Sequence, residues 1–308
     1  MKQSPDEVLF YSNILSGSIS GKLSMVKSVV LITGCSSGIG RALCQAFHAC
    51  GYRVVATARR PESLSELEAQ GMLTLSLDVT QAAAVDHVVD IILAREKRID
   101  ILVNNAGYGQ FGPLMDLSQD VLQRQFATNV FAPLTLIQRV APAMKAQGKG
   151  TIINVGSISG LVTTPFAGAY CASKAAFHAV SDALRLELQP FGIDVVTVQP
   201  GAVTSNFGQA GAASLAGWQA DASWYAPLAE QMKARASLSQ SDGMSAQEFA
   251  HQIVHRVTQV SPPARIRLGP KSRWLPLLRL CLPTRLFEGL LSRKFGLSLL
   301  SSRSSHNR

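Results

Sequence analysis

Short apolar runs rich in β-branched residues alternate with longer amphipathic stretches through most of the chain. Such runs predict buried strands, and the stretches between them have the spacing of helices with one apolar side. Seven strands are predicted, over residues 28–34, 53–58, 73–77, 101–105, 151–156, 194–199 and 265–269. The helical connections are predicted to begin near Gly38, Pro61, Gln81, Gln119, Ala167 and Ser245. Right-handed crossovers would wind this chain into an α/β fold, a doubly wound seven-stranded parallel sheet with helices on both faces.

Three segments depart from this alternation. Residues 1–24 are polar and weakly patterned, so we predict that they are disordered and that residues 25–270 form one folded domain. Within the domain, residues 203–243 form a long segment with no strand or helix pattern that carries several aromatic side chains, which favours a lid over a substrate site. Residues 271–308 form a basic, amphipathic C-terminal tail.

The net charge of +9 is concentrated at the C-terminal end. Residues 264–308 hold ten basic residues and one acid, whereas the preceding residues hold equal numbers of each. Nucleic-acid enzymes more often spread positive charge along the active cleft, so no nucleic-acid partner is expected. Charges and two prolines divide the tail too often for a transmembrane helix, but its leucines could lie flat on an anionic membrane surface. The alternative is that the apolar side of the tail packs on the folded domain near the substrate loop.

The cysteines and the N-terminal residues bear on metal binding and location. None of the five cysteines has the spacing of a metal site, so no metal is expected. The first 24 residues contain no apolar core next to a cleavage site. We therefore expect a cytoplasmic protein, with peripheral contact through the tail on the cytoplasmic face of a membrane as an open alternative.

The first predicted strand ends in the glycine-rich sequence TGCSSGIG, directly before an amphipathic helix. Glycines at 34, 38 and 40 permit a tight turn and a close approach of the backbone to a pyrophosphate, which would lie at the positive end of that helix. A turn without a ligand is the alternative for a glycine triplet alone. The expected cofactor contacts in this Rossmann-type turn are Thr33, Gly34, Ser36, Ser37, Gly38, Ile39 and Gly40.

The second strand ends in Arg59 and Arg60, with no acid before Glu62. An acid here would bind the ribose 2′-hydroxyl of NAD, whereas an arginine can bind the 2′-phosphate of NADP. Arg59 therefore favours NADP(H), unless both arginines are merely solvated. Further cofactor contacts are expected at the ends of the third and fourth strands, at Asp78, Val79, Asn105, Ala106 and Gly107.

Tyr170 and Lys174 lie four residues apart at the start of a predicted helix, so both side chains share one helical face. Ser157 ends the fifth strand, and Asn129 lies on the preceding long helix. All four belong to the carboxyl side of the sheet, where doubly wound folds bind their ligands. They are the candidate catalytic residues, and Asn129, Tyr170 and Lys174 are also candidate cofactor contacts.

The motifs TGCSSGIG, LDVT, NNAG, Asn129, Ser157, YCASK and Pro200-Gly201 keep a fixed order, and with them the chain resembles the short-chain dehydrogenase/reductase superfamily over roughly residues 26–270. The resemblance adds Pro200, Gly201, Val203 and Thr204 to the expected cofactor site, although the sequence GAVTS at 201–205 departs from that of the reductases. The stretches TARR, YCASKAAFHAVSDALRLELQPFGIDV and LPTRLFEGLLSRKFGL are most similar to NADPH-dependent 1-acyldihydroxyacetone-phosphate reductases. Hydroxysteroid and retinol dehydrogenases are close alternatives.

The resemblance implies an enzyme acting on CH-OH groups, in which a hydride passes from the nicotinamide to a carbonyl and Tyr170 protonates the oxygen. Lys174 would lower the Tyr170 pKa and bind the nicotinamide ribose, Ser157 would hold the carbonyl, and Asn129 would anchor a relay water. The expected substrate is a lipophilic ketone or alcohol, in a pocket near Tyr108, Phe111, Leu161 and Phe166. A non-catalytic NADP-sensing protein is the alternative of another class, and a homo-oligomer is an open option.

Overall fold

The computed structural model describes residues 27–237 and 243–300. The predicted disorder of residues 1–24 lies outside the described residues. No helix of the described part of the chain is long and apolar enough to cross a membrane.

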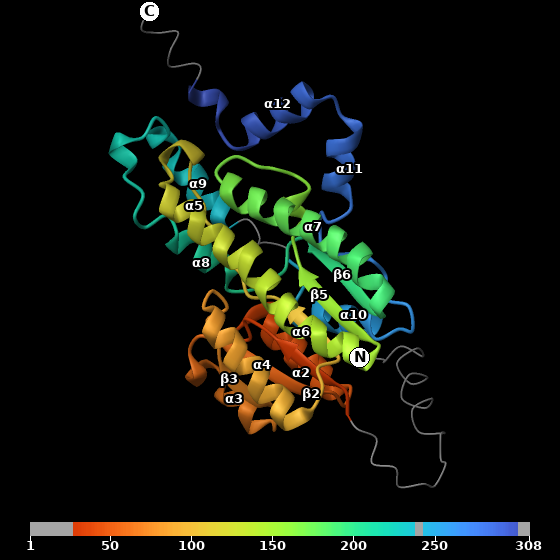
Figure 1. Ribbon diagram of the computed structural model, residues 1–308. Helices are drawn as coiled ribbons and strands as arrows, with labels where there is room; N and C mark the ends of the chain where they lie inside the picture. The colour runs from red at the N-terminus through yellow and green to blue at the C-terminus, as the bar shows by residue number, and fades with distance from the viewer. Residues whose placement is uncertain (1–26, 238–242, 301–308) are drawn as a thin grey trace, which may run out of the picture.

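The described strands form one parallel sheet in the order β3-β2-β1-β4-β5-β6-β7 (Figure 1). The order reverses between β1 and β4, so the chain winds in both directions from the first strand, as predicted. Each observed strand begins and ends within two residues of its predicted range. The strands are β1 (Val29–Ile32), β2 (Arg53–Ala58), β3 (Leu73–Ser76), β4 (Ile101–Asn104), β5 (Gly150–Val155), β6 (Ile193–Pro200) and β7 (Arg265–Leu268).

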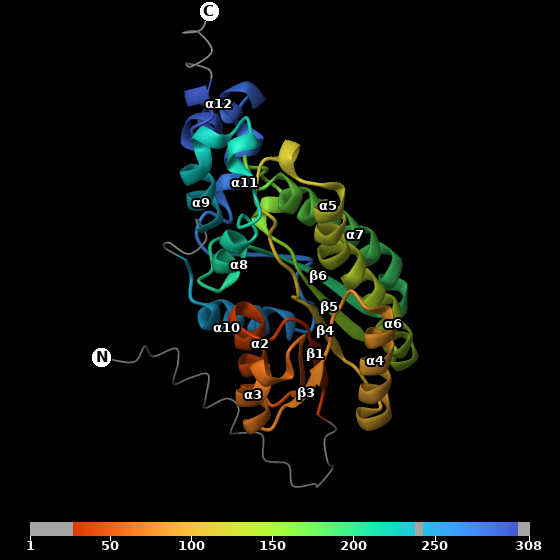
Figure 2. The ribbon, with the colours of Figure 1, turned by 90° about the vertical axis from the view of Figure 1, so that its left-hand side faces the viewer.

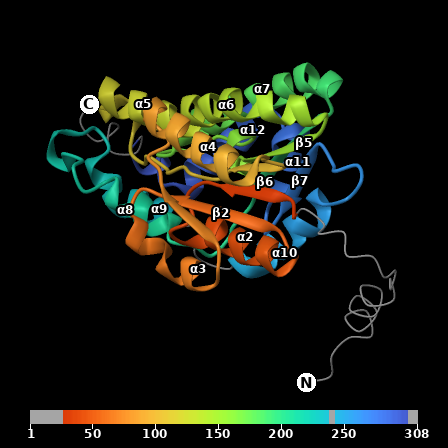
Figure 3. The ribbon, with the colours of Figure 1, turned by 60° about the horizontal axis from the view of Figure 1, so that its bottom comes forward.

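Helices cover both faces of the sheet, because its central strands are apolar on both sides (Figure 3). One face packs against α2 (Gly38–Ala49), α3 (Ser65–Ala69) and α10 (Ala246–Val257), which bury Phe47 and Phe249. The other face packs against α4 (Ala82–Glu96), α6 (Ala132–Gln147) and α7 (Gly168–Leu188). Short 3₁₀ turns lie at Pro61–Leu64, Leu114–Asp116, Ile158–Gly160 and Gln189–Phe191.

The long helix that was predicted to begin near Gln119 is interrupted. Helix α5 (Gln119–Phe126) passes through a π-helical turn (Ala127–Phe131) into α6. A π turn inserts a residue into the helical repeat and often occurs at functional sites. Here it contains Asn129, which is buried.

The segment 203–243 was predicted to be irregular, and this is wrong for its described residues. It contains α8 (Phe207–Ala213) and α9 (Ala229–Ser237), joined through 3₁₀ turns at Ala220–Ala222 and Ala226–Leu228. Alanine is the most frequent residue of these two helices and favours helix, although their short length leaves little apolar periodicity to detect.

The tail forms two helices, α11 (Trp274–Cys281) and α12 (Thr284–Lys294), at the end of the molecule that holds α8 and α9 (Figures 1 and 2). Phe287 and Phe295 are buried, and Phe295 packs with Phe166, Leu228 and Met232. The alternative prediction, in which the apolar side of the tail packs on the folded domain, therefore holds for α12. Trp274, Leu280, Leu286 and Leu290 remain exposed.

Candidate active site

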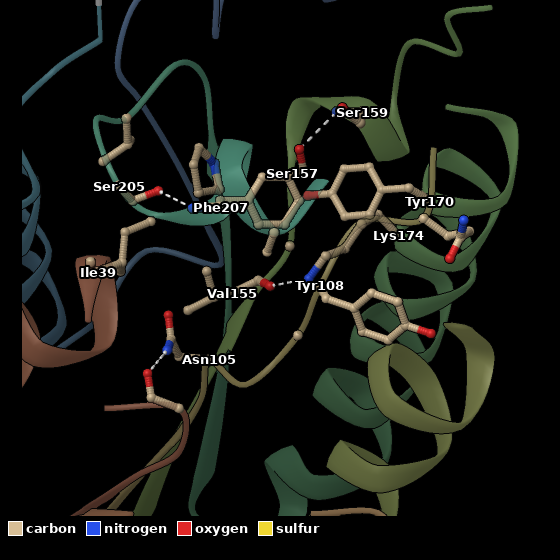
Figure 4. Close-up of a pocket in the computed structure, with 18 of the residues that line it drawn as sticks. Ile39, Asn105, Tyr108, Val155, Ser157, Ser159, Tyr170, Lys174, Ser205 and Phe207 are labelled. Atoms are coloured by element: carbon tan, nitrogen blue, oxygen red, sulfur yellow. Dashed lines mark hydrogen bonds between the residues drawn. The ribbon is translucent and has the colours of Figure 1, made fainter. Parts of the chain in front are cut away.

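A cavity of about 1110 Å³ lies at the carboxyl ends of the parallel strands. Its lining comes from the loops after β1, β2, β4, β5 and β6, from the start of α7, and from α8, α9, α11 and α12. Figure 4 shows part of this lining, with Tyr170 pointing toward Ser157. The parallel sheet brings these residues together because all its strands end on the same side.

The glycine turn before α2 has the backbone that its sequence predicts. Gly34 and Gly38 have φ values of +72° and +56°, in the left-handed region that favours glycine. A Cβ at Gly40 would lie 2.3 Å from the Gly34 carbonyl oxygen, so only glycine fits there. All three glycines line the cavity at the positive end of α2, which fits the pyrophosphate of a dinucleotide.

Thr33 and Asn105 fasten this turn to the end of β4. The Thr33 hydroxyl oxygen accepts hydrogen bonds from the backbone N–H groups of Asn105 and Ala106, both at 3.0 Å. Asn105 Nδ2 donates to the carbonyl oxygens of Thr33 and Gly34 at 2.8 and 3.1 Å. Thr33 is buried and does not line the cavity, so it positions the loop.

Arg59 and Asp78 lie at the end of the cavity formed by β2 and β3. Arg59 is exposed along the cavity, where a phosphate could reach it. The hydroxyl and backbone N–H of Thr80 donate to Asp78 Oδ1 at 2.7 and 3.0 Å. These two hydrogen bonds, and more weakly the Arg59 charge, lower the pKa of Asp78.

Tyr170 and Ser157 meet at the other end of the cavity. Burial raises the pKa of Tyr170 to about 12, and a hydrogen bond with Ser157 acts in the opposite direction. Ser157 follows β5, and its hydroxyl oxygen accepts a hydrogen bond of 3.1 Å from the Ser159 backbone N–H. Two hydroxyl groups therefore converge where a substrate oxygen can be held and protonated.

Lys174 lies one helical turn after Tyr170. Its Nζ donates a hydrogen bond of 2.7 Å to the Val155 carbonyl oxygen, and burial lowers its pKa to about 8. The Ser157 hydrogen bond and the Arg235 charge lower the Tyr170 pKa in this structure, and the predicted effect of Lys174 on that pKa stays a prediction.

Asn129 is buried behind this cluster. Its amide donates to the Tyr108 carbonyl oxygen at 3.0 Å and to the Ser173 hydroxyl at 3.1 Å, and its Oδ1 accepts from the Tyr108 N–H at 3.2 Å. Asn129 does not line the cavity. In this structure it fixes the loop after β4 to helix α7.

His178 holds the Ser157 backbone from the opposite side. Its Nε2 accepts a hydrogen bond of 3.4 Å from the Ser157 N–H, and Gly156 and Gly160 leave room for its ring. Burial lowers the pKa of His178 to about 4, so the ring is a neutral acceptor at pH 7. No sequence spacing links His178 to Ser157, so its contact with the site could not be predicted.

Of the other predicted site residues, Thr204 lies outside the cavity and the remainder line it. Leu161 and Phe166 do not line it; Phe166 packs under the tail instead. Phe111 and Phe207 flank Tyr170, with ring centroids 6.4 and 5.3 Å from the tyrosine ring. The segment 203–243 was predicted to cover the substrate site, and its Asn206 and Arg235 do line the cavity. No motif marks these two residues individually, nor the other lining residues that the sequence did not indicate: Thr164 after β5, and Lys271, Leu275, Leu291, Lys294 and Phe295 in the tail.

The glycine turn at one end of the cavity fits the pyrophosphate of a nicotinamide cofactor, and the two hydroxyls at the other end fit an oxygen that gains or loses a proton, which together suit an NAD(P)-dependent oxidoreductase acting on CH-OH groups. A family model described as short chain dehydrogenase matches residues 28–214. The chain therefore belongs to the short-chain dehydrogenase family.

Two relatives and one solved structure illustrate the similarity. The chain is 33% identical over 262 residues to a 3-ketodihydrosphingosine reductase of Bacteroides thetaiotaomicron, covering 82% of this chain and 94% of the relative. It is 30% identical over 267 residues to an NADPH-dependent 3-dehydrocapnine reductase of Ornithobacterium rhinotracheale, covering 84% and 94%. A short-chain dehydrogenase from Streptomyces avermitilis matches with a TM-score of 0.72 and 31% identity, over 89% of this chain and 98% of that one.

Proposed function

We propose that this enzyme uses NADP(H) to interconvert a ketone and a secondary alcohol on a lipophilic substrate. The observation that carries the proposal is the pair of hydroxyls of Tyr170 and Ser157, which meet beside an apolar wall in a cavity that continues to the glycine turn. The residues at both ends are the catalytic and cofactor-binding residues of this proposal.

In the reducing direction the bound nicotinamide would supply the hydride. The Ser157 hydroxyl would donate a hydrogen bond to the carbonyl oxygen and hold it in place. Tyr170 would donate its phenolic proton to that oxygen as negative charge develops there. With a pKa of about 12, Tyr170 is protonated at neutral pH and ready to donate. Lys174 places an ammonium group behind the tyrosine, held by the Val155 carbonyl oxygen.

The preference for NADP(H) rests on Arg59. It lines the cavity where β2 ends, and no acid takes the corresponding place in the sequence before Glu62. A guanidinium group forms charge-assisted hydrogen bonds to a phosphate, whereas a carboxylate would repel it. The name of the NADPH-dependent relative supports the same cofactor.

We infer a lipophilic substrate from the apolar lining of the same cavity, which includes Phe111, Val162, Phe207 and Leu291. An acyl chain fits such a wall, and 1-acyldihydroxyacetone phosphate is the substrate that the sequence resemblance favours; steroids and retinoids are the alternatives. The test is a screen of purified enzyme with NADPH against acyl-dihydroxyacetone phosphates, keto-steroids, retinal and simple ketones. Tight NADPH binding without turnover of any of these would favour the sensing protein over the enzyme.

A peripheral membrane contact is part of the same proposal. The exposed apolar residues of α11 lie next to the helix α12 that borders the cavity, and Arg273 and Arg279 lie among them. A lipophilic substrate could then enter from a bilayer surface to which α11 is bound.

A further inference from the structure

The cavity carries more positive charge than the proposed cofactor site uses. Among the described residues its charged lining consists of one acid, Asp78, and six bases: Arg59, Arg124, Lys174, Arg235, Lys271 and Lys294. Arg59 and Lys174 belong to the cofactor and catalytic groups. Of the other four bases, Arg235 is partly buried and the remaining three are exposed.

Arg235, on α9, has only neutral partners. Its Nε and Nη2 atoms donate to the Thr164 hydroxyl oxygen at 2.9 and 2.7 Å, and its guanidinium lies 5.3 Å from the centroid of the Phe111 ring. No carboxylate in the described part of the chain forms an ion pair with it. A cation withdrawn from water without a counter-charge is costly, and an anion from a ligand would offset that cost.

Arg235 lies close to the reacting group. Both contact the Phe111 ring, whose centroid is 5.3 Å from the Arg235 guanidinium and 6.4 Å from the Tyr170 ring centroid. The Arg235 charge also acts on Tyr170, where it lowers the pKa of the phenol. An anion bound to Arg235 would therefore lie near the carbon that is reduced beside Tyr170.

A second cation reaches the same place from the tail. The Phe295 ring lies 6.0 Å from the Arg235 guanidinium and 5.9 Å from Lys294 Nζ, and all three residues line the cavity. Two cations around one ring fit a doubly charged phosphate better than a singly charged carboxylate.

The cofactor phosphates belong to a different part of the cavity. The glycine turn follows β1 and Arg59 follows β2, on the side of the sheet switch point opposite β5 and β6, which carry Ser157 and the lid. Figure 1 places α9 and α12 at the far end of the molecule from β2. Arg235 and Lys294 are therefore available to the substrate.

We propose that Arg235, assisted by Lys294, binds a phosphate group of the substrate, so that the enzyme acts on phosphorylated lipophilic ketones. This inference rests on the proposed function and narrows it. It favours a phosphate-bearing acyl ketone over neutral steroids and retinoids. Arg235 would determine specificity, and Tyr170 would still supply the proton.

The first test compares 1-palmitoyl-dihydroxyacetone phosphate with 1-palmitoyl-dihydroxyacetone, two ketones that differ only in the phosphate. Losing a charge-assisted contact typically costs about 10- to 100-fold in affinity. Arg235→Gln should lower kcat/KM for the phosphorylated ketone by that factor more than for the neutral ketone, mainly through KM, because any effect of the lost charge on the Tyr170 pKa is common to both ketones. Arg235→Lys should retain part of the preference, and Lys233→Gln, an exposed neutralisation on the same helix, should retain all of it.

The Thr164→Val variant tests whether Arg235 acts by binding the ligand or only by its hydrogen bonds to Thr164, because it removes the Thr164 hydroxyl and leaves the guanidinium. It should keep the preference for the phosphorylated ketone. The proposal is overturned if wild-type enzyme reduces both ketones equally well, if Arg235→Gln lowers both rates alike, or if Thr164→Val reproduces the effect of Arg235→Gln.

A binding measurement without turnover distinguishes failure of this inference from failure of the proposed function. Dodecyl phosphate, dodecanoate and dodecanol are titrated calorimetrically into enzyme with NADP⁺. Dodecyl phosphate should bind the wild-type enzyme at least about 10-fold more tightly than it binds the Arg235→Gln variant, and dodecanol should bind the two proteins with equal affinity. If the enzyme reduces none of the ketones in the screen described above, the proposed function fails, while this titration still decides on the phosphate site: equal affinities of wild type and Arg235→Gln for dodecyl phosphate, or tighter binding of dodecanoate than of dodecyl phosphate, overturn it.

Discussion

Lys174 Nζ donates a hydrogen bond of 2.7 Å to the carbonyl oxygen of Val155, the last residue of β5. This contact joins the catalytic helix α7 to β5 and holds a buried ammonium group beside the end of that strand. Burial lowers the pKa of Lys174 from 10.5 to about 8, which means that folding disfavours its charged form. The lysine is thus kept for its function at a cost in stability.

Replacing this lysine by methionine should stabilise the protein at pH 7. Because the folded-state pKa is below the unfolded one, the cost is fully present below pH 8 and disappears as pH rises through 10.5. The pKa shift corresponds to a destabilisation of the folded protein by roughly 3 kcal/mol. The variant would remove this cost but would also lose the hydrogen bond to Val155, which offsets about 1 kcal/mol of the gain. Lys174→Met should therefore gain about 2 kcal/mol at pH 7 in urea unfolding without cofactor, and should lose turnover.

The pH dependence of this gain in stability tests whether the buried charge of Lys174 causes it. The gain should shrink as the unfolding measurements move from pH 7 toward pH 10.5, whereas Lys233→Met, on the exposed side of α9, should change stability little at either pH. A variant that is no more stable than wild type at pH 7 would contradict a buried, costly ammonium group.

Tyr170→Phe should remove turnover and leave NADPH binding intact. The ring keeps its contacts with Phe111 and Phe207, and only the proton donor is lost. General acid catalysis contributes typically about 100- to 10,000-fold, which is the expected loss in kcat. NADPH fluorescence titration and steady-state rates measure the two effects, with Tyr52→Phe as the matched control. Lys174→Ala should weaken both; unchanged turnover in Tyr170→Phe would refute the mechanism.

The sheet could be predicted from sequence because each of its strands is a short apolar run between polar turns. Strand β4, for example, is buried along its whole length and reads as an uninterrupted apolar segment before Asn104. The helices of the lid and tail were not predictable in the same way. Their burial depends on partners far away in sequence, such as Phe166 for Phe295.

The cofactor and catalytic ends of the site follow from motifs, since Gly34, Ser157 and Tyr170 lie in short sequences with fixed spacing. The substrate end does not. Arg235 and Lys294 lie on separate helices that meet only in the folded chain, and nothing in their local sequence distinguishes them from solvated charges. The role of Arg235 depends on its partial burial, and the role of both residues depends on the absence of an acidic partner among the described residues, which only the structure reveals.

Arg59→Asp should shift the cofactor preference from NADPH toward NADH. It replaces a phosphate partner with a carboxylate that repels the 2′-phosphate and can accept from the ribose hydroxyl. The loss in kcat/KM for NADPH should be about 10- to 100-fold, with a smaller or opposite change for NADH. Arg60→Asp is the control, because Arg60 is exposed and does not line the cavity. A wild-type enzyme that prefers NADH would show that Arg59 has no such role.

The last prediction concerns helix α11 and anionic membranes. Trp274 and Leu280 are 72% and 83% exposed, unlike Phe287 and Phe295 of the tail, which are buried. Removing the whole tail would uncover Phe166, Leu228 and Met232 and take away part of the cavity wall, so loss of binding by such a truncation could reflect misfolding. Surface substitutions on α11 avoid that ambiguity.

Wild type should sediment with phosphatidylserine vesicles more than with phosphatidylcholine vesicles, and Trp274→Ser/Leu280→Ser should lose most of that binding. Basic residues near an anionic surface contribute about 1 kcal/mol each, so raised salt should weaken the binding, while burial of the two apolar side chains should leave a salt-resistant part that the double variant lacks. Leu186→Ser, an exposed leucine on α7, is the control for a general loss of apolar surface. Equal sedimentation of wild type and the double variant, with unchanged thermal stability, would exclude α11 as the membrane contact.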